Sequence, residues 1–403
     1  MKLAYATAIL VSFPTTLAIT MDGNYTVFTH VQTQIRNGAI PCRGVNLGGW
    51  LVFEHWMTSN AAVSKSIDSR YLDSGEFISI TKSENPDKVR SMLSKHHDTF
   101  ITEDDIKQIA AAGVNTLRVP VGFWIIGYDN YDPTNQREIE AYSPGTIMYL
   151  DRLIRVWAMK YNVAVLVDVH AAKGSQNGND HSSPSTPGQI LWSEKRENIA
   201  NTIEVVRFLA ARYINDEAFL GIGLLNEPRG NVSASLLYQY YLDAYQVVRS
   251  TGSDCVLTIM SMLDSKNPME LAGFMPMPRY KNVWVEWHSY FIWTYENRTN
   301  KHLVEVDVKQ DYQEKMTKWN AMTDNNPLFI GEWSFASPSN MLLNDPELFY
   351  EFAKAQLEIH SQAAKGWTYW TWKLDVKGNK LDSWSLQRLL TDDRIAKLLR
   401  NTL

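Results

Sequence analysis

The sequence of 403 residues predicts an α/β fold, namely one closed (β/α)8 barrel of the TIM type. Short segments of strand character, each bounded by polar or turn residues, follow one another from residue 44 to residue 373. Several of them are continuously apolar, as expected of parallel strands that are buried on both faces. Stretches of helical character lie between them, and repeated alternation of strand and helix favours a closed barrel over an open sheet.

The strand segments can be read off in chain order. They are GVNLGGWLV (44–52), GVNTLRVPV (113–121), VAVLVDVH (163–170), LGIGLLNE (220–227), CVLTIMS (255–261), VWVEWHSY (283–290), PLFIGEWS (327–334) and GWTYWTWK (366–373). The clearest helix is expected from Glu194 to Tyr213, where apolar residues recur at three- and four-residue spacing. Another begins at TEDD (102–105), whose threonine and acidic residues suit a helix N-terminus. No linker or repeat divides the chain, so residues 19–403 are expected to form a single catalytic domain.

The first 18 residues, MKLAYATAILVSFPTTLA, predict a secretory signal peptide that is cleaved after Ala18. The alternative, a membrane anchor, is disfavoured because polar residues and Pro14 interrupt the apolar run, which is shorter than the ~20 residues that a span needs. We therefore expect an exported protein without membrane insertion, acting as a monomer. The formal net charge of −5 provides no surplus of cations for phosphates, which argues against a nucleic-acid partner.

Two further sequence features bear on an exported chain. Acceptor triplets for N-glycosylation begin at Asn24, Asn231 and Asn297, so we expect a glycoprotein. The only two cysteines are Cys42, before the first strand, and Cys255, at the start of the fifth. In a barrel these lie on opposite sides of the ring, whereas a disulfide needs Cα atoms within about 7 Å. Both cysteines are therefore predicted to be free.

Polar and aromatic residues cluster at the ends of the predicted strands. In a (β/α)8 barrel these ends open into the loops that carry the chemistry, so the residues there are candidates for a functional site. They are Glu54, Arg118, Asp168, His170, Asn226, Glu227, His288, Tyr290, Glu332 and Trp372.

Glu227 and Glu332 form the central pair, each at the end of an apolar strand. A single glutamate there could form a loop salt bridge, but two carboxylates at the mouth of one barrel are what cleavage of a glycosidic bond requires. Arg118 is a cation that could keep one of them ionised, or it could simply tie strands together. The 14 Trp and 19 Tyr residues suit the recognition of sugar rings, although aromatic-rich cores also exist.

The ordered series RGVNLGGWLV, VNTLRVPVGFW, DVHAAKGSQNGNDHS, LLNEP, WHSYF, IGEWS and YWTWK resembles glycoside hydrolase family five, and closely its fungal and oomycete exo-1,3-β-glucanase branch. The resemblance runs from about Gly38 to the end of the eighth strand. It implies a secreted, retaining hydrolase that releases glucose from the non-reducing end of 1,3-β-glucan. The chain has no HExxH or clustered Cys/His ligand pattern, so we expect it to need no metal or other cofactor. Alternatives are an endo-acting relative that cleaves 1,6-β-glucan, mannan or cellulose, a non-catalytic carbohydrate-binding or elicitor protein on the same barrel, and transglycosylation.

The resemblance also implies roles for the catalytic residues. Glu227 matches the general acid/base and Glu332 the nucleophile, with Arg118 and Tyr290 holding Glu332 by charge and by a hydrogen bond. Asn226 would bind the sugar 2-hydroxyl. His170 and His288 would line the same subsite; as residues alone, they could also be hydrogen-bonded structural histidines.

Further residues would shape the sugar pocket. Trp372 would lie beneath the glucose ring, while Trp370 would take an interior or helix-facing position. Glu54 would contact hydroxyls of the terminal glucose and close the pocket, although it could pair with a loop cation instead. Trp293 would supply one half of an aromatic clamp at the entrance, whose usual partner position holds Asn179 in this chain.

Overall fold

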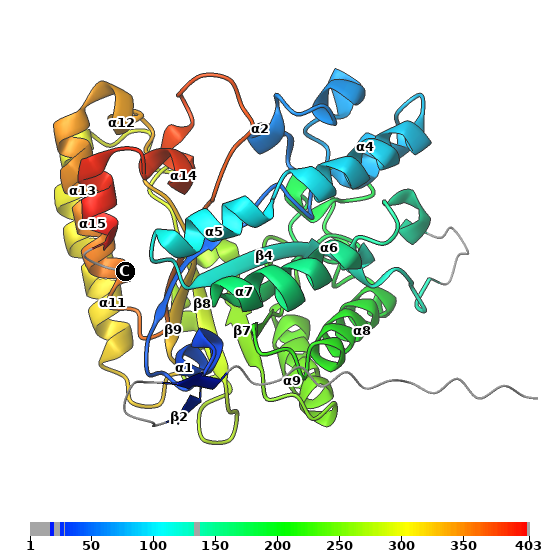
Figure 1. Cartoon of the computed structure of the whole chain (residues 1–403), viewed down its shortest axis with the longest axis horizontal. Coiled ribbons are helices and arrows are strands. Elements are labelled where there is room, and N and C mark those ends of the chain that lie inside the picture. Colours follow the sequence, from blue (N-terminus) through cyan, green and yellow to red (C-terminus); the bar gives the residue numbers. More distant parts are fainter. Residues whose placement is uncertain (1–16, 20–24, 28, 133–137, 401–403) are drawn as a thin grey trace, which may run out of the picture.

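The computed structural model describes residues 17–19, 25–27, 29–132 and 138–400 (Figure 1). Most of the expected signal peptide and the acceptor residue Asn24 lie outside these ranges. Residues 17 and 18 belong to strand β1 (Leu17–Ile19), which pairs antiparallel with β2 (Tyr25–Val27). Cleavage after Ala18 therefore stays a prediction. Among the described residues, no helix is both long and apolar enough to cross a membrane.

Eight parallel strands close into one barrel in the order β10-β3-β4-β5-β6-β7-β8-β9, which confirms the predicted fold. The strands are β3 (Cys42–Asn46), β4 (Thr116–Gly122), β5 (Ala164–Ala171), β6 (Phe219–Gly223), β7 (Val256–Met260), β8 (Val283–Ser289), β9 (Leu328–Trp333) and β10 (Gly366–Tyr369). The first, fourth and last end several residues earlier than predicted. After β3, for example, the chain turns at Gly49, whose φ of 67° suits glycine.

Helices surround the barrel on its outer side (Figure 1). They are α5 (Glu103–Ala111) after β3; α6 (Ile147–Arg152) and α7 (Met159–Tyr161), joined by the π-helical stretch η5 (Leu153–Ala158), after β4; α8 (Arg196–Arg212) after β5; α9 (Ala234–Ser250) after β6; α10 (Asn300–His302), the π-helical η9 (Leu303–Tyr312) and α11 (Gln313–Asn320) after β8; α12 (Met341–Asn344) and α13 (Pro346–His360) after β9; and α14 (Leu386–Leu389) and α15 (Asp393–Arg400) after β10. The regular alternation fails once. Between β7 and β8 the chain, described throughout, forms only the short 3-10 turns η7 (Leu263–Ser265) and η8 (Pro268–Leu271).

Two helices form as their sequences predict. Thr102 caps α5 and forms a reciprocal capping box with Asp105, which satisfies backbone N–H groups at the first turn. The periodic segment 194–213 forms α8, which buries its apolar stripe against the barrel.

The barrel interior changes from apolar to polar along the strands. On β5, Ala164 and Leu166 belong to a buried apolar cluster at the lower end, and Asp168 follows two residues later on the same face. Helix α1 (Val31–Arg36) covers this lower end and contributes Val31 and Ile35 to the cluster. The lower half is therefore a packed core, and the polar half opens toward the loops.

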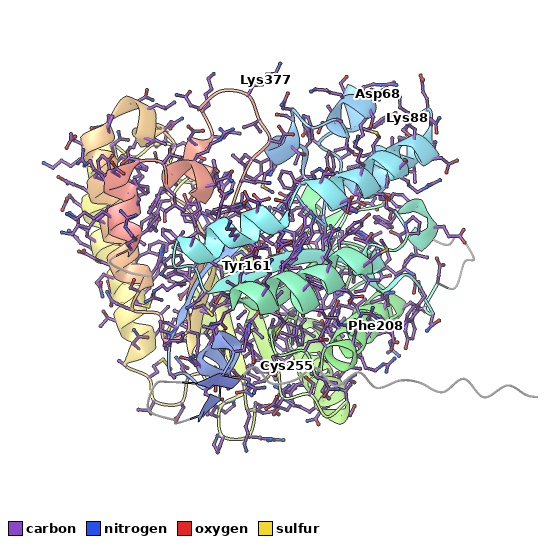
Figure 2. The ribbon with its side chains drawn as sticks, viewed as in Figure 1. Asp68, Lys88, Tyr161, Phe208, Cys255 and Lys377 are labelled. Atoms are coloured by element: carbon purple, nitrogen blue, oxygen red, sulfur yellow. The ribbon has the colours of Figure 1, made fainter. Side chains whose placement is uncertain are left out.

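The loops at the polar end carry most of the additional structure. Between β3 and α5 lie α2 (His55–Thr58), α3 (Glu76–Thr81) and α4 (Pro86–Thr99), and after β10 lies the short turn η10 (Asp382–Trp384). Figure 2 shows Asp68 and Lys377, one from each of these two loops, near the top of the view and Cys255 near the bottom. Cys42 and Cys255 are both free, as predicted. Cys42 lies on β3 and Cys255 just before β7, which is the strand opposite β3 in the barrel.

Candidate active site

The polar end of the barrel opens into a cavity of about 910 Å³. Seven of the residues proposed from the sequence line it: Glu54, His170, Glu227, His288, Tyr290, Trp293 and Glu332. Arg118, Asp168 and Asn226 do not line the cavity but are buried, and Arg118 contacts Glu332, Asn226 and Asp168. Trp372 is the one predicted residue that has no contact with this group.

Arg118 on β4 is fully buried and organises the cavity floor. Its guanidinium donates hydrogen bonds of 2.9 Å to Glu332 Oε1 and to Asn226 Oδ1. It also forms ion pairs of 3.0 Å with Asp168 and 2.9 Å with Glu286. Burial alone would lower the pKa of Arg118, but the three carboxylates outweigh burial and raise it. The arginine therefore stays charged and offsets part of the negative charge of the site.

Glu332 is the last-but-one residue of β9, and both of its carboxylate oxygens have donors. Arg118 donates to Oε1, and the hydroxyl of Tyr290 donates to Oε2 at 2.8 Å. Burial raises the pKa of Tyr290, so its hydroxyl keeps the proton that it donates. A carboxylate that is held at both oxygens in a cavity is suited to attack an electrophilic carbon.

Glu227 follows β6 in a left-handed backbone conformation, with φ of 47°. This conformation is costly for a residue other than glycine, and such strain is concentrated at functional sites. Oε1 of Glu227 lies 2.8 Å from Nδ1 of His288, and Oε2 lies 3.5 Å from Nε2 of His181. The backbone turn thus directs this carboxylate into the cavity and toward two histidines.

His288 on β8 lies between carboxylates. In addition to Glu227, its ring faces Glu286 at 3.1 Å and Glu332 at 3.6 Å. Burial would lower the pKa of His288, but the carboxylates raise it to about 10, so the ring is an imidazolium. Conversely, burial raises the pKa of Glu227, and the hydrogen bond and charge of His288 outweigh burial and hold it at about 2. The two side chains therefore share one proton, which lies on His288 in the free protein.

His170 and Asp168 form a second buried pair, on β5. Nδ1 of His170 lies 2.8 Å from Oδ2 of Asp168. Burial lowers the pKa of His170 well below its usual range, so this ring is neutral at pH 7, and burial raises the pKa of Asp168 to about 7. The His170 ring stacks on Trp370, with centroids 5.5 Å apart and an interplanar angle of 9°. Trp370 lines the cavity.

The predicted positions of the two tryptophans are exchanged in the structure. Trp372 is buried in the core outside the cavity, and its indole N–H donates to Asp105 of α5 at 3.0 Å. The prediction that Trp372 lies at the sugar site is therefore wrong, and Trp370 occupies the cavity wall instead. The physical reason is that β10 ends at Tyr369, after which the alternation of a strand no longer fixes side-chain direction.

The cavity wall next to Glu54 contains aromatic residues that the sequence did not single out. Glu54 is buried and accepts a hydrogen bond of 2.9 Å from the indole of Trp56, whereas its Oε1 has no partner among the described residues. Burial and nearby carboxylates raise the pKa of Glu54 well above its usual range. Trp384, from the loop after β10, packs between Trp56 and Trp293 at centroid distances of 5.4 Å and 5.8 Å. Trp56 and Trp384 come from loop segments that carry no recognisable sequence motif.

The entrance differs on its two sides. Trp293 is 55% exposed and packs edge-on against Tyr290, and Asn179 also lines the cavity. Of the two positions in the predicted clamp, one therefore holds the aromatic Trp293 and the other the polar Asn179.

Glu227, His288 and Glu332 offer ligand atoms within 4.8 Å of one another, a spacing that could also hold a metal ion. The same atoms are already paired, however. His288 Nδ1 faces Glu227, and Glu332 accepts from Tyr290 and Arg118. Each of these three side chains therefore already has a charged or hydrogen-bonding partner within the protein.

Comparison with known proteins gives consistent relationships. Residues 80–375 match the family described as Cellulase (glycosyl hydrolase family 5). A glucan 1,3-beta-glucosidase of Schwanniomyces occidentalis is 29% identical over 86% of this chain and 85% of its own length. A probable glucan 1,3-beta-glucosidase A of Aspergillus fumigatus is 28% identical over 93% and 92%. Among solved structures, a rutinosidase from Aspergillus niger shares the fold with a TM-score of 0.70 at 20% identity, over 89% of this chain and 98% of that one.

Proposed function

Because this chain belongs to glycosyl hydrolase family 5, we propose that it is a retaining glucan 1,3-β-glucosidase that releases glucose from the non-reducing end of 1,3-β-glucan. Glu332 is the nucleophile and Glu227 the general acid/base in this proposal. The relatives named glucan 1,3-beta-glucosidase, which cover most of the chain, support the substrate class.

The observation that carries the proposed mechanism is the spacing of the two glutamates. A carboxylate oxygen of Glu227 and one of Glu332 lie within 4.8 Å of each other. Retaining glycosidases hold their carboxyl groups about 5 Å apart, whereas inverting enzymes need a wider gap for a water molecule. The spacing therefore favours direct attack by one carboxylate over activation of water by it.

In the first step, Glu332 attacks the anomeric carbon and forms a covalent glycosyl-enzyme, while Glu227 protonates the leaving oxygen. The proton comes from the His288–Glu227 pair, across their contact of 2.8 Å. In the second step, Glu227 removes a proton from water, and the resulting hydroxide oxygen attacks the anomeric carbon and releases Glu332. Asn226 contributes its Nδ2, which has no partner in the described part of the chain, to the sugar 2-hydroxyl.

Removal of a terminal glucose needs a pocket that is closed at one end. Glu54 and Trp56 support such closure, because both line the cavity and Glu54 Oε1 has no hydrogen-bond partner among the described residues. Trp370 supplies a flat ring for the glucose to stack on. The leaving sugar then lies toward Trp293 and Asn179.

Several properties of the whole chain belong to the same proposal. Residues 1–18 are removed as a signal peptide, and residues 19–403 act as a single secreted, monomeric domain at the cell wall or outside the cell. The acceptor residues Asn231 and Asn297 are exposed, which is compatible with N-glycosylation.

The proposal is tested by incubating the protein with a laminari-oligosaccharide and following the products by NMR. We expect β-glucose to be released first, one unit at a time. Mixed oligosaccharides would indicate endo action, longer products transglycosylation, and α-glucose inversion. The variant Glu332→Ala should fold normally and lose turnover, and substantial residual hydrolysis would remove Glu332 from its assigned role.

A further inference from the structure

Glu286 is a buried carboxylate one layer below the cavity that the mechanism above does not use. It is 3% exposed and lies on β8 two residues before His288, so both side chains point into the barrel. It does not line the cavity and cannot reach a sugar there.

Glu286 contacts both cations of the site. Its Oε1 lies 2.9 Å from Nε of Arg118 and 3.1 Å from Nε2 of His288. Its Oε2 accepts a hydrogen bond from the hydroxyl of Thr258 on β7. Arg118 in turn contacts Glu332, and His288 contacts Glu227. One carboxylate therefore joins the two cations that hold the two proposed catalytic groups.

The neighbouring strand leaves room for this carboxylate. A Cβ atom on Gly331 of β9 would lie 1.9 Å from Glu286 Oε1, so that position accepts no side chain. A protein with a buried charged side chain is little more stable than one with an apolar side chain of the same size at that position. Stability alone thus gives no reason to place a carboxylate here.

The contacts of Glu286 bear on the charge of His288. A neutral imidazole has only one N–H, so it can donate to only one carboxylate. Here both ring nitrogens face carboxylate oxygens, Nδ1 that of Glu227 and Nε2 that of Glu286. While both carboxyl groups are ionised, both contacts are hydrogen bonds only when the ring carries two protons.

We propose that Glu286 is a positioning residue of the hydrolase. It fixes Arg118 and His288 in place, and it keeps the proton that Glu227 delivers bound to the His288–Glu227 pair. The inference rests on the proposed function only for the role of Glu227. Other charged or titratable groups also surround His288 and remain when Glu286 is changed. They are Glu227 and His181 from the loops after β6 and β5, Glu332 on β9, Arg118 on β4, Asp168 and His170 on β5, Tyr290 after β8, and Glu54 after β3.

The direction of the effect follows from the charges. Glu286 is an anion beside the imidazolium, so its removal makes the shared proton easier to lose. The active protein needs that proton, and the alkaline limb of its pH profile should therefore move to lower pH. The acidic limb should move less.

The test compares Glu286→Gln with Glu286→Asp. The pH dependence of kcat/KM is measured on a laminari-oligosaccharide, and the protonation of His288 is followed by NMR of ¹⁵N-labelled histidine, assigned with His288→Gln. For Glu286→Gln we expect kcat to fall about tenfold or more, and both the alkaline limb and the His288 titration to move down by about one pH unit or more. Glu286→Asp, which keeps the charge, should recover part of both shifts.

Glu76→Gln is the matched control, because Glu76 is equally buried but has no contact with His288. It should leave the alkaline limb in place. The proposal is overturned if folded Glu286→Gln keeps the alkaline limb of the wild-type pH profile and the wild-type titration of His288. It is also overturned if Glu286→Gln and Glu286→Asp lose stability and show no other change. If neither variant folds, the wild-type protein decides: a His288 that loses its proton near the ordinary pKa of about 6.5 would refute the proposal. The histidine measurement needs no substrate, so it stays readable if the hydrolysis assay fails.

Discussion

The hydroxyl of Tyr290 donates a hydrogen bond of 2.8 Å to Oε2 of Glu332, the oxygen that Arg118 does not contact. A hydrogen bond to a charged group contributes about 1.5–3 kcal/mol. Tyr290→Phe removes this donor while keeping the ring. We expect kcat/KM for a laminari-oligosaccharide to fall by about 10- to 100-fold, with the fold unchanged.

Tyr238→Phe is a suitable control for that variant, because Tyr238 lies on α9 and does not line the cavity. Its kcat/KM should equal that of the wild type. Equal activity in Tyr290→Phe would show that Glu332 does not depend on the hydroxyl.

Arg118 is surrounded by three carboxylates, and its loss should affect stability as well as activity. Arg118→Met leaves Asp168, Glu286 and Glu332 buried without their shared cation. We expect turnover to disappear and the free energy of unfolding at pH 7 to fall by about 3–5 kcal/mol. Because protonation neutralises the unpaired carboxylates, the loss should shrink when denaturant unfolding is repeated at pH 4 to 5.

Arg394→Met offers a comparison, since it breaks the exposed ion pair with Glu347. Exposed pairs contribute about 0–1 kcal/mol, so this variant should unfold almost like the wild type. A loss for Arg118→Met that is equally small, or equal at both pH values, would contradict the assigned charge balance.

The sequence predicted the barrel because its strands are apolar and its motifs lie where strands end. It also predicted which carboxylates meet, since the carboxyl ends of parallel strands surround one opening. Glu286 was missed because it lies within a strand rather than at its end. The available signal was its spacing of two residues from His288, which places both on the inner face. Trp56 and Trp384 come from loops, whose paths depend on long-range packing that local sequence does not encode.

The exchanged positions of Trp370 and Trp372 give a direct test with two matched variants. Trp370→Phe reduces the flat surface at the cavity, so we expect kcat/KM to fall by about tenfold with a smaller effect on unfolding. Trp372→Phe removes the hydrogen bond to Asp105, so we expect the free energy of unfolding to fall by about 1–3 kcal/mol. Its KM should stay near that of the wild type. Kinetics and urea unfolding measure both effects, and the opposite pattern would return Trp372 to the sugar site.

Glu76 on α3 predicts how stability changes with pH. The carboxyl group is fully buried and accepts a hydrogen bond of 3.2 Å from the backbone N–H of Phe53, next to Glu54. Burial raises the pKa of Glu76 to about 8, whereas a glutamate in the unfolded chain has a pKa of about 4.3. Below the unfolded value both states are protonated, and Glu76 does not make stability depend on pH.

Between about pH 4.3 and 8 the unfolded chain ionises Glu76 and the folded protein does not, so this residue lowers the free energy of unfolding by about 1.4 kcal/mol for each pH unit. Glu76→Gln cannot ionise and removes that term. Denaturant unfolding at pH 5, 6 and 7 should therefore show that the free energy of unfolding of the variant increases relative to that of the wild type at each step. This difference should level off near pH 8, where folded Glu76 ionises too. Glu84→Gln, at an exposed position, should follow the wild type throughout. A constant difference between Glu76→Gln and the wild type would mean that Glu76 is ionised in the folded protein and that the backbone N–H of Phe53 holds a carboxylate.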